Sequence, residues 1–124
     1  MNAKKRVVIL GLIPEVVDYS RWPGLTPEKL MAQLTADEGK LNELGYKAQL
    51  CLVDLGETAG ATVTQTLSTD SFDCVVIGAG VRTAPELLLF FEKLINLVHQ
   101  YAPSAKICFN SKPSDTAEAV QRWV

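Results

Sequence analysis

Short runs of apolar residues along the chain alternate with longer stretches in which apolar residues recur at helical spacing. The runs at 5–12 and 73–79 each contain an unbroken series of branched apolar residues, at 7–10 and 75–77, which is typical of strands buried on both faces of a parallel sheet. The run at 46–55 alternates apolar and polar residues, as a half-exposed edge strand does. A short fourth run lies at 106–110. This pattern predicts four strands, with the first and third at the centre of the sheet.

Two stretches of helical spacing flank the second predicted strand. The stretch at 26–44 opens with Thr26 as a hydroxyl N-cap, followed by a proline and an acid, and it ends before Gly45, which suits the left-handed residue after a helix. The stretch at 58–67 contains four threonines and a glycine, which lower helix propensity. We therefore expect a strong helix before this strand and a weak one after it.

Two further helices are expected in the second half of the chain. The stretch at 84–101 has the clearest helical pattern, with Thr83 as its expected N-cap. A last helix is predicted to begin after Ser114 or Asp115, and Glu118 stands three residues after Asp115, as in a capping box.

Strands and helices alternate throughout the chain, and no internal repeat or linker interrupts them. This order requires right-handed crossovers and a three-layer α/β/α arrangement around a parallel sheet. With the continuous strands at the centre and the alternating strand at an edge, the predicted strand order is 2-1-3-4. The topology is Rossmann-like and resembles the first four strands of flavodoxin-like folds, without the fifth strand. We expect a single α/β domain over residues 1–124.

Charge and hydropathy argue against two classes of partner. Charged residues make up 21% of the sequence and the net charge is −2, and the basic cluster at 4–6 is not continued as a basic stripe of the kind that binds nucleic acid. The longest apolar stretch, 87–98, contains Glu92, Lys93 and Asn96, so it is too interrupted to span a membrane. We therefore expect no nucleic-acid partner and no membrane association.

Three cysteines lie in three different apolar runs, at Cys51, Cys74 and Cys108. Their number is odd, and their spacing matches neither a Cys-x-x-Cys motif nor a Cys/His metal site. We interpret them as reduced core residues of a cytoplasmic protein.

A ligand is expected at the edge formed by the carboxyl ends of the strands, called the rim below. In open parallel sheets ligands bind there, at the point where successive connections reverse direction, which in this chain lies between the first and third strands. The segments that follow the strands at this edge carry glycine, hydroxyl, amide and cationic residues. The predicted ligand-binding residues are Gly11, Gly78, Gly80, Arg82, Thr83, Asn110, Ser111, Lys112 and Ser114.

These residues favour a small anionic or nucleotide-like ligand. Gly78 and Gly80 let the backbone approach a guest closely, and Arg82 and Lys112 supply positive charge beside expected helix N-termini. A structural role is the alternative, in which the glycines allow a tight turn, the cations are solvated and Ser114 caps a helix.

The connection at 14–26 is long for a link between a strand and a helix. It contains Tyr19, Arg21 and Trp22, which we interpret as a lid over a ring-bearing ligand. In the alternative interpretation, Trp22 plugs the end of the core.

Known families of this topology differ from the chain at the positions that carry their chemistry. The Gly-x-Gly at 78–80 resembles a dinucleotide fingerprint, but Thr83 stands in place of the third glycine. The segment at 12–18 lacks the phosphate loop of flavodoxins, and no cysteine follows the first strand as in sugar-transport phosphocarriers. Lys112–Pro113 is similar to the dipeptide after the last strand of response-regulator receivers, whose acidic pair and phosphoacceptor aspartate are missing. The sequence identifies no cofactor.

Catalytic residues are not evident in the sequence. His99 is the only histidine, and it lies late in the third predicted helix, away from the rim. No Ser/His/Asp set, metal-ligand cluster or nucleophile elbow is present. Asp54, at the end of the second strand, is the best candidate for a general base.

The predicted helix at 84–101 carries more apolar surface than one face of a sheet can cover. It flanks the fourth strand, an edge of the sheet, and a second copy of the chain packed across this side would cover the surplus. The alternative cover is provided by neighbouring helices and Trp123. The apolar residues of this helix are Leu87, Leu88, Leu89, Phe90, Phe91, Leu94, Ile95, Leu97, Val98 and Tyr101.

Two functional hypotheses follow. The first is a small-ligand binding protein, either an enzyme or a non-catalytic binder, whose anionic or nucleotide-like ligand lies at the rim. The second is a non-catalytic interaction module, either a homodimer through the 84–101 helix or a receiver-like domain without the phosphoacceptor aspartate.

Overall fold

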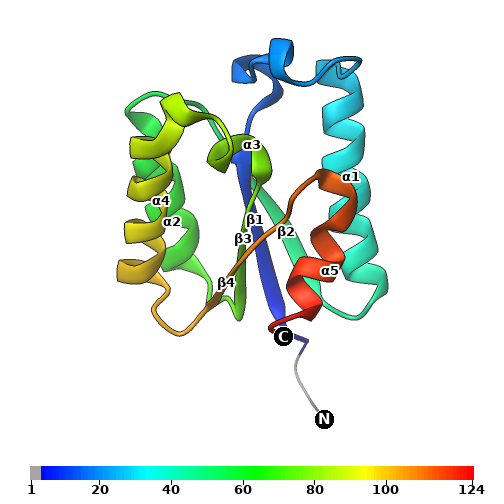
Figure 1. Ribbon diagram of the computed structural model, residues 1–124. Coiled ribbons are helices and arrows are strands. Elements are labelled where there is room, and N and C mark those ends of the chain that lie inside the picture. The colour runs from blue at the N-terminus through cyan, green and yellow to red at the C-terminus, as the bar shows by residue number, and fades with distance from the viewer. Residues whose placement is uncertain (1–3) are drawn as a thin grey trace.

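The computed structural model describes residues 4–124 and contains a four-stranded parallel sheet (Figure 1). The strand order is β2-β1-β3-β4, which confirms the predicted fold class and topology. In register, Val7 of β1 lies opposite Ala48 of β2 and Cys74 of β3. The strands are β1 (Arg6–Leu12), β2 (Lys47–Val53), β3 (Cys74–Ile77) and β4 (Lys106–Phe109).

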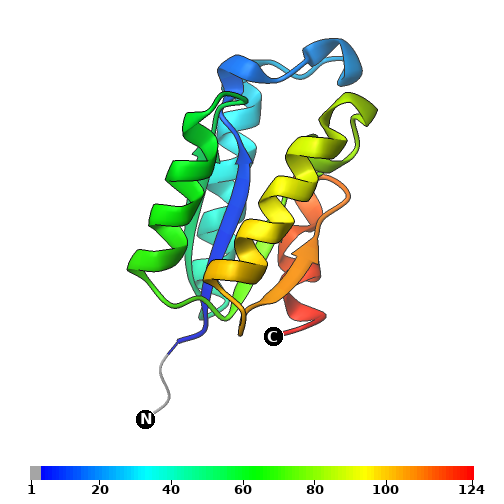
Figure 2. The same cartoon turned by 90° about the vertical axis from the view of Figure 1, so that its left-hand side faces the viewer.

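Helices cover both faces of the sheet, so the fold has three layers. Helices α2 and α4 lie on one face, and α1 and α5 lie on the other (Figures 1 and 2). No helix within residues 4–124 has the length and apolar character needed to cross a membrane. The helices are α1 (Pro27–Glu43), α2 (Thr58–Thr69), α3 (Ala79–Arg82), α4 (Leu88–Tyr101) and α5 (Thr116–Gln121).

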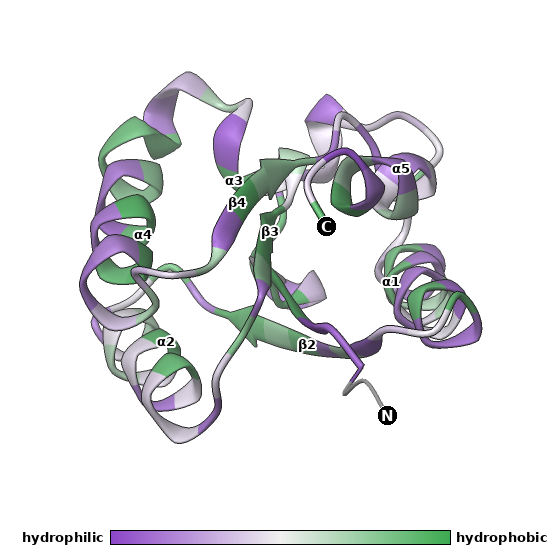
Figure 3. Cartoon of the chain, turned by 90° about the horizontal axis from the view of Figure 1, so that it is seen from below, coloured by the Kyte–Doolittle hydropathy of each residue, from purple (hydrophilic) through white to green (hydrophobic). Residues whose placement is uncertain are grey.

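The central strands β1 and β3 contribute side chains to two separate cores. Val8 and Ile77 belong to the core under α2 and α4, and Val7 and Val76 belong to the core under α1 and α5. All four are fully buried, and burial of each such side chain stabilises the fold by about 1.5–3 kcal/mol. Figure 3 shows hydrophobic colour along the strands and, alternating with hydrophilic colour, on the helices that cover them. Burial on both faces explains why these strands read as unbroken apolar runs.

Helix α1 forms as its sequence predicts. The Thr26 hydroxyl accepts a hydrogen bond from the Lys29 backbone N–H at 3.2 Å, and a proline occupies the first turn. Leu34 and Leu41 are buried under the helix, and Gly45 beyond its end has a φ of +100°. The weak helix predicted at 58–67 is also present, as α2.

The edge position of β2 is confirmed, but its inward-facing residues differ from the predicted alternation. Cys51, placed among the polar positions of the sequence pattern, is buried with Val53 in the core under α2 and α4. Ala48 and Leu50 pack from the other face, against the core under α1 and α5. Because helices cover both faces, even this edge strand is buried on two sides.

The predicted start of the long helix at 84–101 is wrong. The backbone first forms the short helix α3, whose end is capped by Thr83, and the hydroxyl of Thr83 donates to the Ala79 carbonyl at 2.8 Å. Ala84, which precedes Pro85, is extended, with φ −83° and ψ 122°, because a residue before proline is excluded from the helical region. Helix α4 therefore begins only at Leu88, and Thr83 is not its N-cap.

The predicted capping box of the last helix is also wrong. Asp115 occupies the N-cap position of α5, but its side chain makes no capping hydrogen bond. The carboxylate instead accepts hydrogen bonds from the Ser111 N–H at 3.0 Å, the Lys112 N–H at 3.3 Å and the Ser111 hydroxyl. These bonds fold the 110–115 segment back on itself, so Asp115 is turned away from the helix.

Two glycines give a matched test of the backbone conformation of α1: Gly39 lies within the helix, and Gly45 lies just beyond its C-terminal end. Gly45→Ala is expected to destabilise the fold by about 1 kcal/mol, because its positive φ strains any residue with a Cβ. Gly39→Ala is expected to stabilise it by about 0.5–1 kcal/mol, because Gly39 is helical and a Cβ there meets nothing within 4 Å. Urea unfolding midpoints measure both changes, and equal effects from the two substitutions would contradict the assigned conformations.

Candidate functional site

A cavity of about 460 Å³ lies at the rim, beyond the ends of β1 and β3 on the side of α1. This is the position expected for a ligand in a parallel sheet, and the volume is within the range of small-molecule sites. We call it the rim cavity. It is lined by Gly11, Leu12, Val17, Arg21, Trp22, Pro23, Gly24, Leu25, Lys29, Leu30, Gln33, Leu34, Gly78, Ala79, Gly80, Val81, Asn110 and Lys112.

The body of the rim cavity is apolar. Leu12 at the end of β1 and Val81 of α3 are buried beneath it. Leu30 and Leu34 form the wall on the side of α1, and each has 9% of its surface exposed. The half-buried Trp22 closes the cavity from the 14–26 connection. A hydrocarbon or aromatic group placed here would be partly shielded from water.

The charged residues that line the rim cavity are all cations: Arg21, Lys29 and Lys112. Within residues 4–124 no acidic side chain takes part in the lining. The Lys29 ammonium donates to the Gly24 carbonyl at 3.2 Å. Within residues 4–124 the Lys112 ammonium is in no hydrogen bond or ion pair, but after the hydrogen bonds from Ser111 and the Lys112 N–H its charge also helps to lower the pKa of the Asp115 carboxylate. The charged side chains of the lining therefore present positive charge to the cavity.

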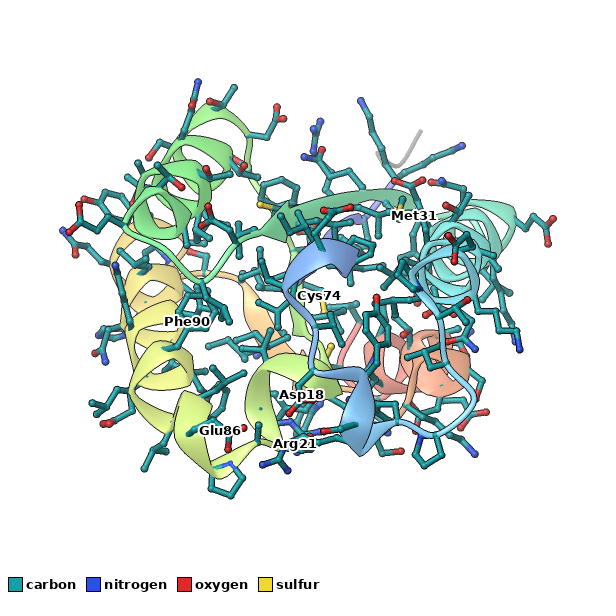
Figure 4. The ribbon with its side chains drawn as sticks, turned by 90° about the horizontal axis from the view of Figure 1, so that it is seen from above. Asp18, Arg21, Met31, Cys74, Glu86 and Phe90 are labelled. Atoms are coloured by element: carbon teal, nitrogen blue, oxygen red, sulfur yellow. The ribbon has the colours of Figure 1, made fainter. Side chains whose placement is uncertain are left out.

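Arg21 differs from the two lysines because its charge is already paired. Its guanidinium donates to both carboxylate oxygens of Glu86, at 2.8 and 3.1 Å, and lies 3.8 Å from the Asp18 carboxylate. Figure 4 shows these three side chains gathered at the rim. The contact joins the 14–26 connection to the segment before α4, so Arg21 holds the cavity wall in place.

The 14–26 connection has further internal hydrogen bonds and is not an open coil. It contains two 3₁₀ turns, Pro14–Val16 and Tyr19–Arg21. The Tyr19 hydroxyl donates to the Pro14 carbonyl at 2.7 Å, so this ring is directed back into the connection and does not line the cavity. The Asp18 carboxylate accepts from the Ser20 N–H and hydroxyl, and these bonds lower the pKa of Asp18.

The structure brings only some of the predicted site residues to the rim cavity. Thr83 lines a smaller neighbouring cavity of about 110 Å³, and Ser111 is bound to Asp115. Ser114 and Arg82 do not line the rim cavity. The predicted residues that do line it are Gly11, Gly78, Gly80, Asn110 and Lys112.

Arg82 is directed toward β4. Its guanidinium donates to the Asn110 carbonyl and lies over the Phe109 ring, 5.3 Å from the centroid. Its Nε is buried and has no hydrogen-bond partner. Arg82 therefore joins the end of α3 to the end of β4, and this contact occupies the charge that the sequence assigned to a ligand.

A chain of hydrogen bonds runs beneath the rim cavity and passes through Asn110, which is only 6% exposed. Its Oδ1 accepts from the Ala79 N–H at 2.8 Å, and its Nδ2 donates to the Thr116 hydroxyl at 2.9 Å. The Thr116 hydroxyl in turn donates to Oδ2 of Asp37 at 2.9 Å. Both polar atoms of the Asn110 amide are thus hydrogen-bonded within the protein. The resulting chain of hydrogen bonds connects the end of β4 with α3, α5 and α1.

Asp37, at the end of this chain of hydrogen bonds, has a perturbed pKa. Burial between α1 and α5 raises its pKa from 3.8 to about 6. The hydrogen bond from Thr116 and the charge of Lys40 oppose this shift, whereas the negative charge of Asp115 adds to it. At neutral pH the carboxylate is therefore held in its ionised form at some cost to stability.

Residues suited to catalysis or metal binding do not gather at the rim. Asp54 accepts hydrogen bonds from the Gly56 N–H and the Thr58 hydroxyl at the start of α2, and it does not line the rim cavity. His99 is exposed in the last turn of α4. This end of α4 lies at the opposite end of the molecule from the rim (Figure 1). Residues 4–124 contain no group of three His, Cys, Asp or Glu side chains placed to hold a metal ion.

Parts of the site were missed at the sequence level. Val17, Leu25 and the face of α1 that carries Gln33 are not among the predicted residues, yet they line the rim cavity. The unusual length of the 14–26 connection indicated that this segment covers the rim. Nothing in the sequence pattern indicated the pairing of Arg21 with Glu86, because these residues lie 65 positions apart.

Replacing Asp37 tests the direction of its pKa shift. Because the folded-state pKa lies above the unfolded value, the native state binds more protons, so this group makes the protein less stable as the pH rises from about 4 to about 6. Asp37→Asn keeps an acceptor for Thr116 and should stabilise the protein above pH 6 by on the order of 1 kcal/mol, after allowance for solvent screening.

Urea unfolding of Asp37→Asn and the unsubstituted protein at about pH 4 and about pH 7, which are the lower limit of this window and a value above it, measures this difference. Asp18→Asn is the control with the opposite sign. The pKa of Asp18 is lowered in the folded protein, so its carboxylate adds stability as the pH rises, and the variant should become less stable relative to the unsubstituted protein. An Asp37→Asn variant that is less stable than the unsubstituted protein at pH 7 would contradict the assignment.

The arrangement at the rim is suited to binding: an apolar body, two available ammonium groups and a covering connection held by an ion pair. No protein-family model matches the chain, and no curated protein matches it significantly in sequence.

Proposed function

We propose that the chain binds a small organic anion in the rim cavity. The observation that carries this proposal is the composition of the lining, whose charged residues are three cations and include no acid within residues 4–124. Arg21 is neutralised by Glu86, which leaves Lys29 and Lys112 to attract an anion. Such a site raises the local concentration of anions and orients them as they enter.

The position of the cavity supports the same proposal. The carboxyl ends of β1 and β3, the point of reversal in the topology, form its base. The 14–26 connection, an element longer than a simple link requires, provides Trp22 as a wall. Loops that are ordered over a preformed cavity commonly carry binding residues.

Filling the rim cavity with a side chain should abolish binding. A Cβ built on Gly80 meets nothing within 4 Å, so Gly80→Leu is expected to fold and to occupy part of the cavity. Gly39→Leu is the matched control, because Gly39 also has open space around it but does not line the cavity.

Thermal shift assays with inorganic phosphate, AMP, octanoate and 2-naphthoate test the proposal. At least one anion is expected to raise the melting temperature of the unsubstituted protein and of Gly39→Leu, and to leave Gly80→Leu unchanged. The proposal fails when none of the four anions stabilises the protein, or when Gly80→Leu is stabilised as much as its control.

A homodimer through α4 is the second candidate function, and one observation favours it. Leu88 and Leu89, in the first turn of α4, are 57% and 78% exposed. Most other apolar residues of this helix are covered: Leu94 and Val98 are buried, and Phe90 packs against the core under α2 and α4. The exposed apolar surface is therefore concentrated near the start of the helix.

Sizing chromatography with light scattering at micromolar concentration tests the dimer. A two-fold contact around Leu88 and Leu89 predicts a dimer that Leu89→Glu converts to a monomer without loss of stability. Leu44→Glu, at an exposed apolar position beyond α1, is the control and should remain dimeric. A monomeric unsubstituted protein would contradict the proposal.

We also infer a cytoplasmic location. It is supported by the three cysteines, which are buried and unpaired. The sulfurs of Cys74 and Cys108 lie 3.3 Å apart on neighbouring strands without a disulfide between them. Buried free thiols are typical of proteins from a reducing compartment.

A further inference from the structure

We propose that the ligand of the rim cavity is a hydrophobic carboxylic acid, with a hydrocarbon body and one carboxylate, and not a nucleotide. This inference rests on the proposed function, because it takes the rim cavity as the binding site. The inference concerns the chemical class of the ligand. The polar groups that line the cavity limit which ligands can bind there.

The lining offers few polar partners to the body of a ligand. Its uncharged polar side-chain groups are those of Gln33 and Asn110 and the indole N–H of Trp22. Asn110 is only 6% exposed and already bonds Ala79 through its oxygen and Thr116 through its nitrogen, which leaves Gln33 and the indole N–H. A ribose and a base present several donors and acceptors, and each one left unpaired in a buried site costs about 1–3 kcal/mol. The cavity therefore disfavours a nucleotide and accepts a body without polar groups.

The walls of the rim cavity fit such a body. Leu12, Leu30 and Leu34 come from regular elements, so this apolar surface is preformed. Trp22, from the 14–26 connection, adds a flat aromatic wall. Enclosure of a hydrocarbon chain or ring between these side chains removes apolar surface from water, which is the main favourable term for ligands of this type.

The available cations suit a carboxylate, which makes smaller demands than a phosphate monoester. A phosphate monoester carries about −1.5 to −2 charge and three acceptor oxygens, whereas a carboxylate carries one charge and two oxygens. A guanidinium group pairs with either anion through two parallel hydrogen bonds, but both arginines near the rim are engaged, Arg21 with Glu86 and Arg82 with the Asn110 carbonyl. The ammonium groups of Lys29 and Lys112 remain, and each acts as a point charge. They supply attraction for a single negative charge at the mouth of an apolar cavity.

Titration calorimetry with matched ligands tests this inference. Octanoate and its neutral isostere octanamide share one hydrocarbon body, so the ratio of their dissociation constants reports the contribution of the charge. We expect octanoate to bind about tenfold more tightly than octanamide, and AMP to bind more weakly than octanoate.

Lysine variants show whether this charge preference comes from the rim. The double variant Lys29→Gln/Lys112→Gln should bring octanoate to within about twofold of octanamide, because both ligands would then lack a charged partner. Lys47→Gln is the control: Lys47 is exposed at the start of β2, at the opposite end of the sheet, and its removal should leave the ratio unchanged.

The outcomes separate this inference from the proposed function. AMP binding more tightly than octanoate, with loss of AMP binding in Gly80→Leu, would overturn the carboxylic-acid assignment and leave the anion site standing. Equal affinity for octanoate and octanamide would overturn the role of the lysines and with it the carboxylate. Absence of binding by octanoate, 2-naphthoate, AMP and phosphate would overturn both proposals, as would octanoate binding that Gly80→Leu leaves intact.

Discussion

The buried amide of Asn110 is the contact on which the arrangement at the rim depends. Its oxygen fixes the Ala79 N–H at the start of α3, its nitrogen fixes the Thr116 hydroxyl at the start of α5, and Thr116 extends the connection to Asp37 on α1. The ionised carboxylate of Asp37 can only accept a hydrogen bond, so the Thr116 hydroxyl must donate to it. The same hydroxyl therefore accepts from the Asn110 amide, which fixes the donor and acceptor at each step. A single side chain thus positions the elements that surround the rim cavity.

Much of the fold could be predicted because it follows from burial. Strands β1 and β3 carry apolar residues on both faces, which is possible only at the centre of a sheet covered by two helical layers. The remaining order follows from right-handed crossovers. The exceptions were local. Pro85 separates α3 from α4, and Asp115 binds the Ser111 and Lys112 amides instead of capping α5. In both places a local hydrogen-bonding or steric preference overrides the helical pattern.

The sequence predicted a candidate site at the rim, and a cavity lies there, but the contacts of its charged residues could not be predicted. Gly11, Gly80 and Lys112 line this cavity. Arg82 lies there in sequence, but its guanidinium is drawn to the Asn110 carbonyl and the Phe109 ring. Arg21 pairs with Glu86 across 65 positions, a contact that depends on the completed tertiary structure. Among the cations that line the rim cavity, Arg21 is paired with an acid. Lys29 and Lys112 are the cations that form no ion pair within residues 4–124.

The central claim is that the rim cavity holds a hydrophobic acid between α1, the strand ends and Trp22. Amide and indole chemical shifts in a ¹⁵N-labelled protein titrated with octanoate test it most directly, since every backbone N–H and both tryptophans are observed separately. The account predicts saturable shifts at the Trp22 indole and the Gly80 amide, with the Trp123 indole unchanged. Shifts confined to α4 around Leu89 and to Trp123, or no saturable shifts at all, would contradict it.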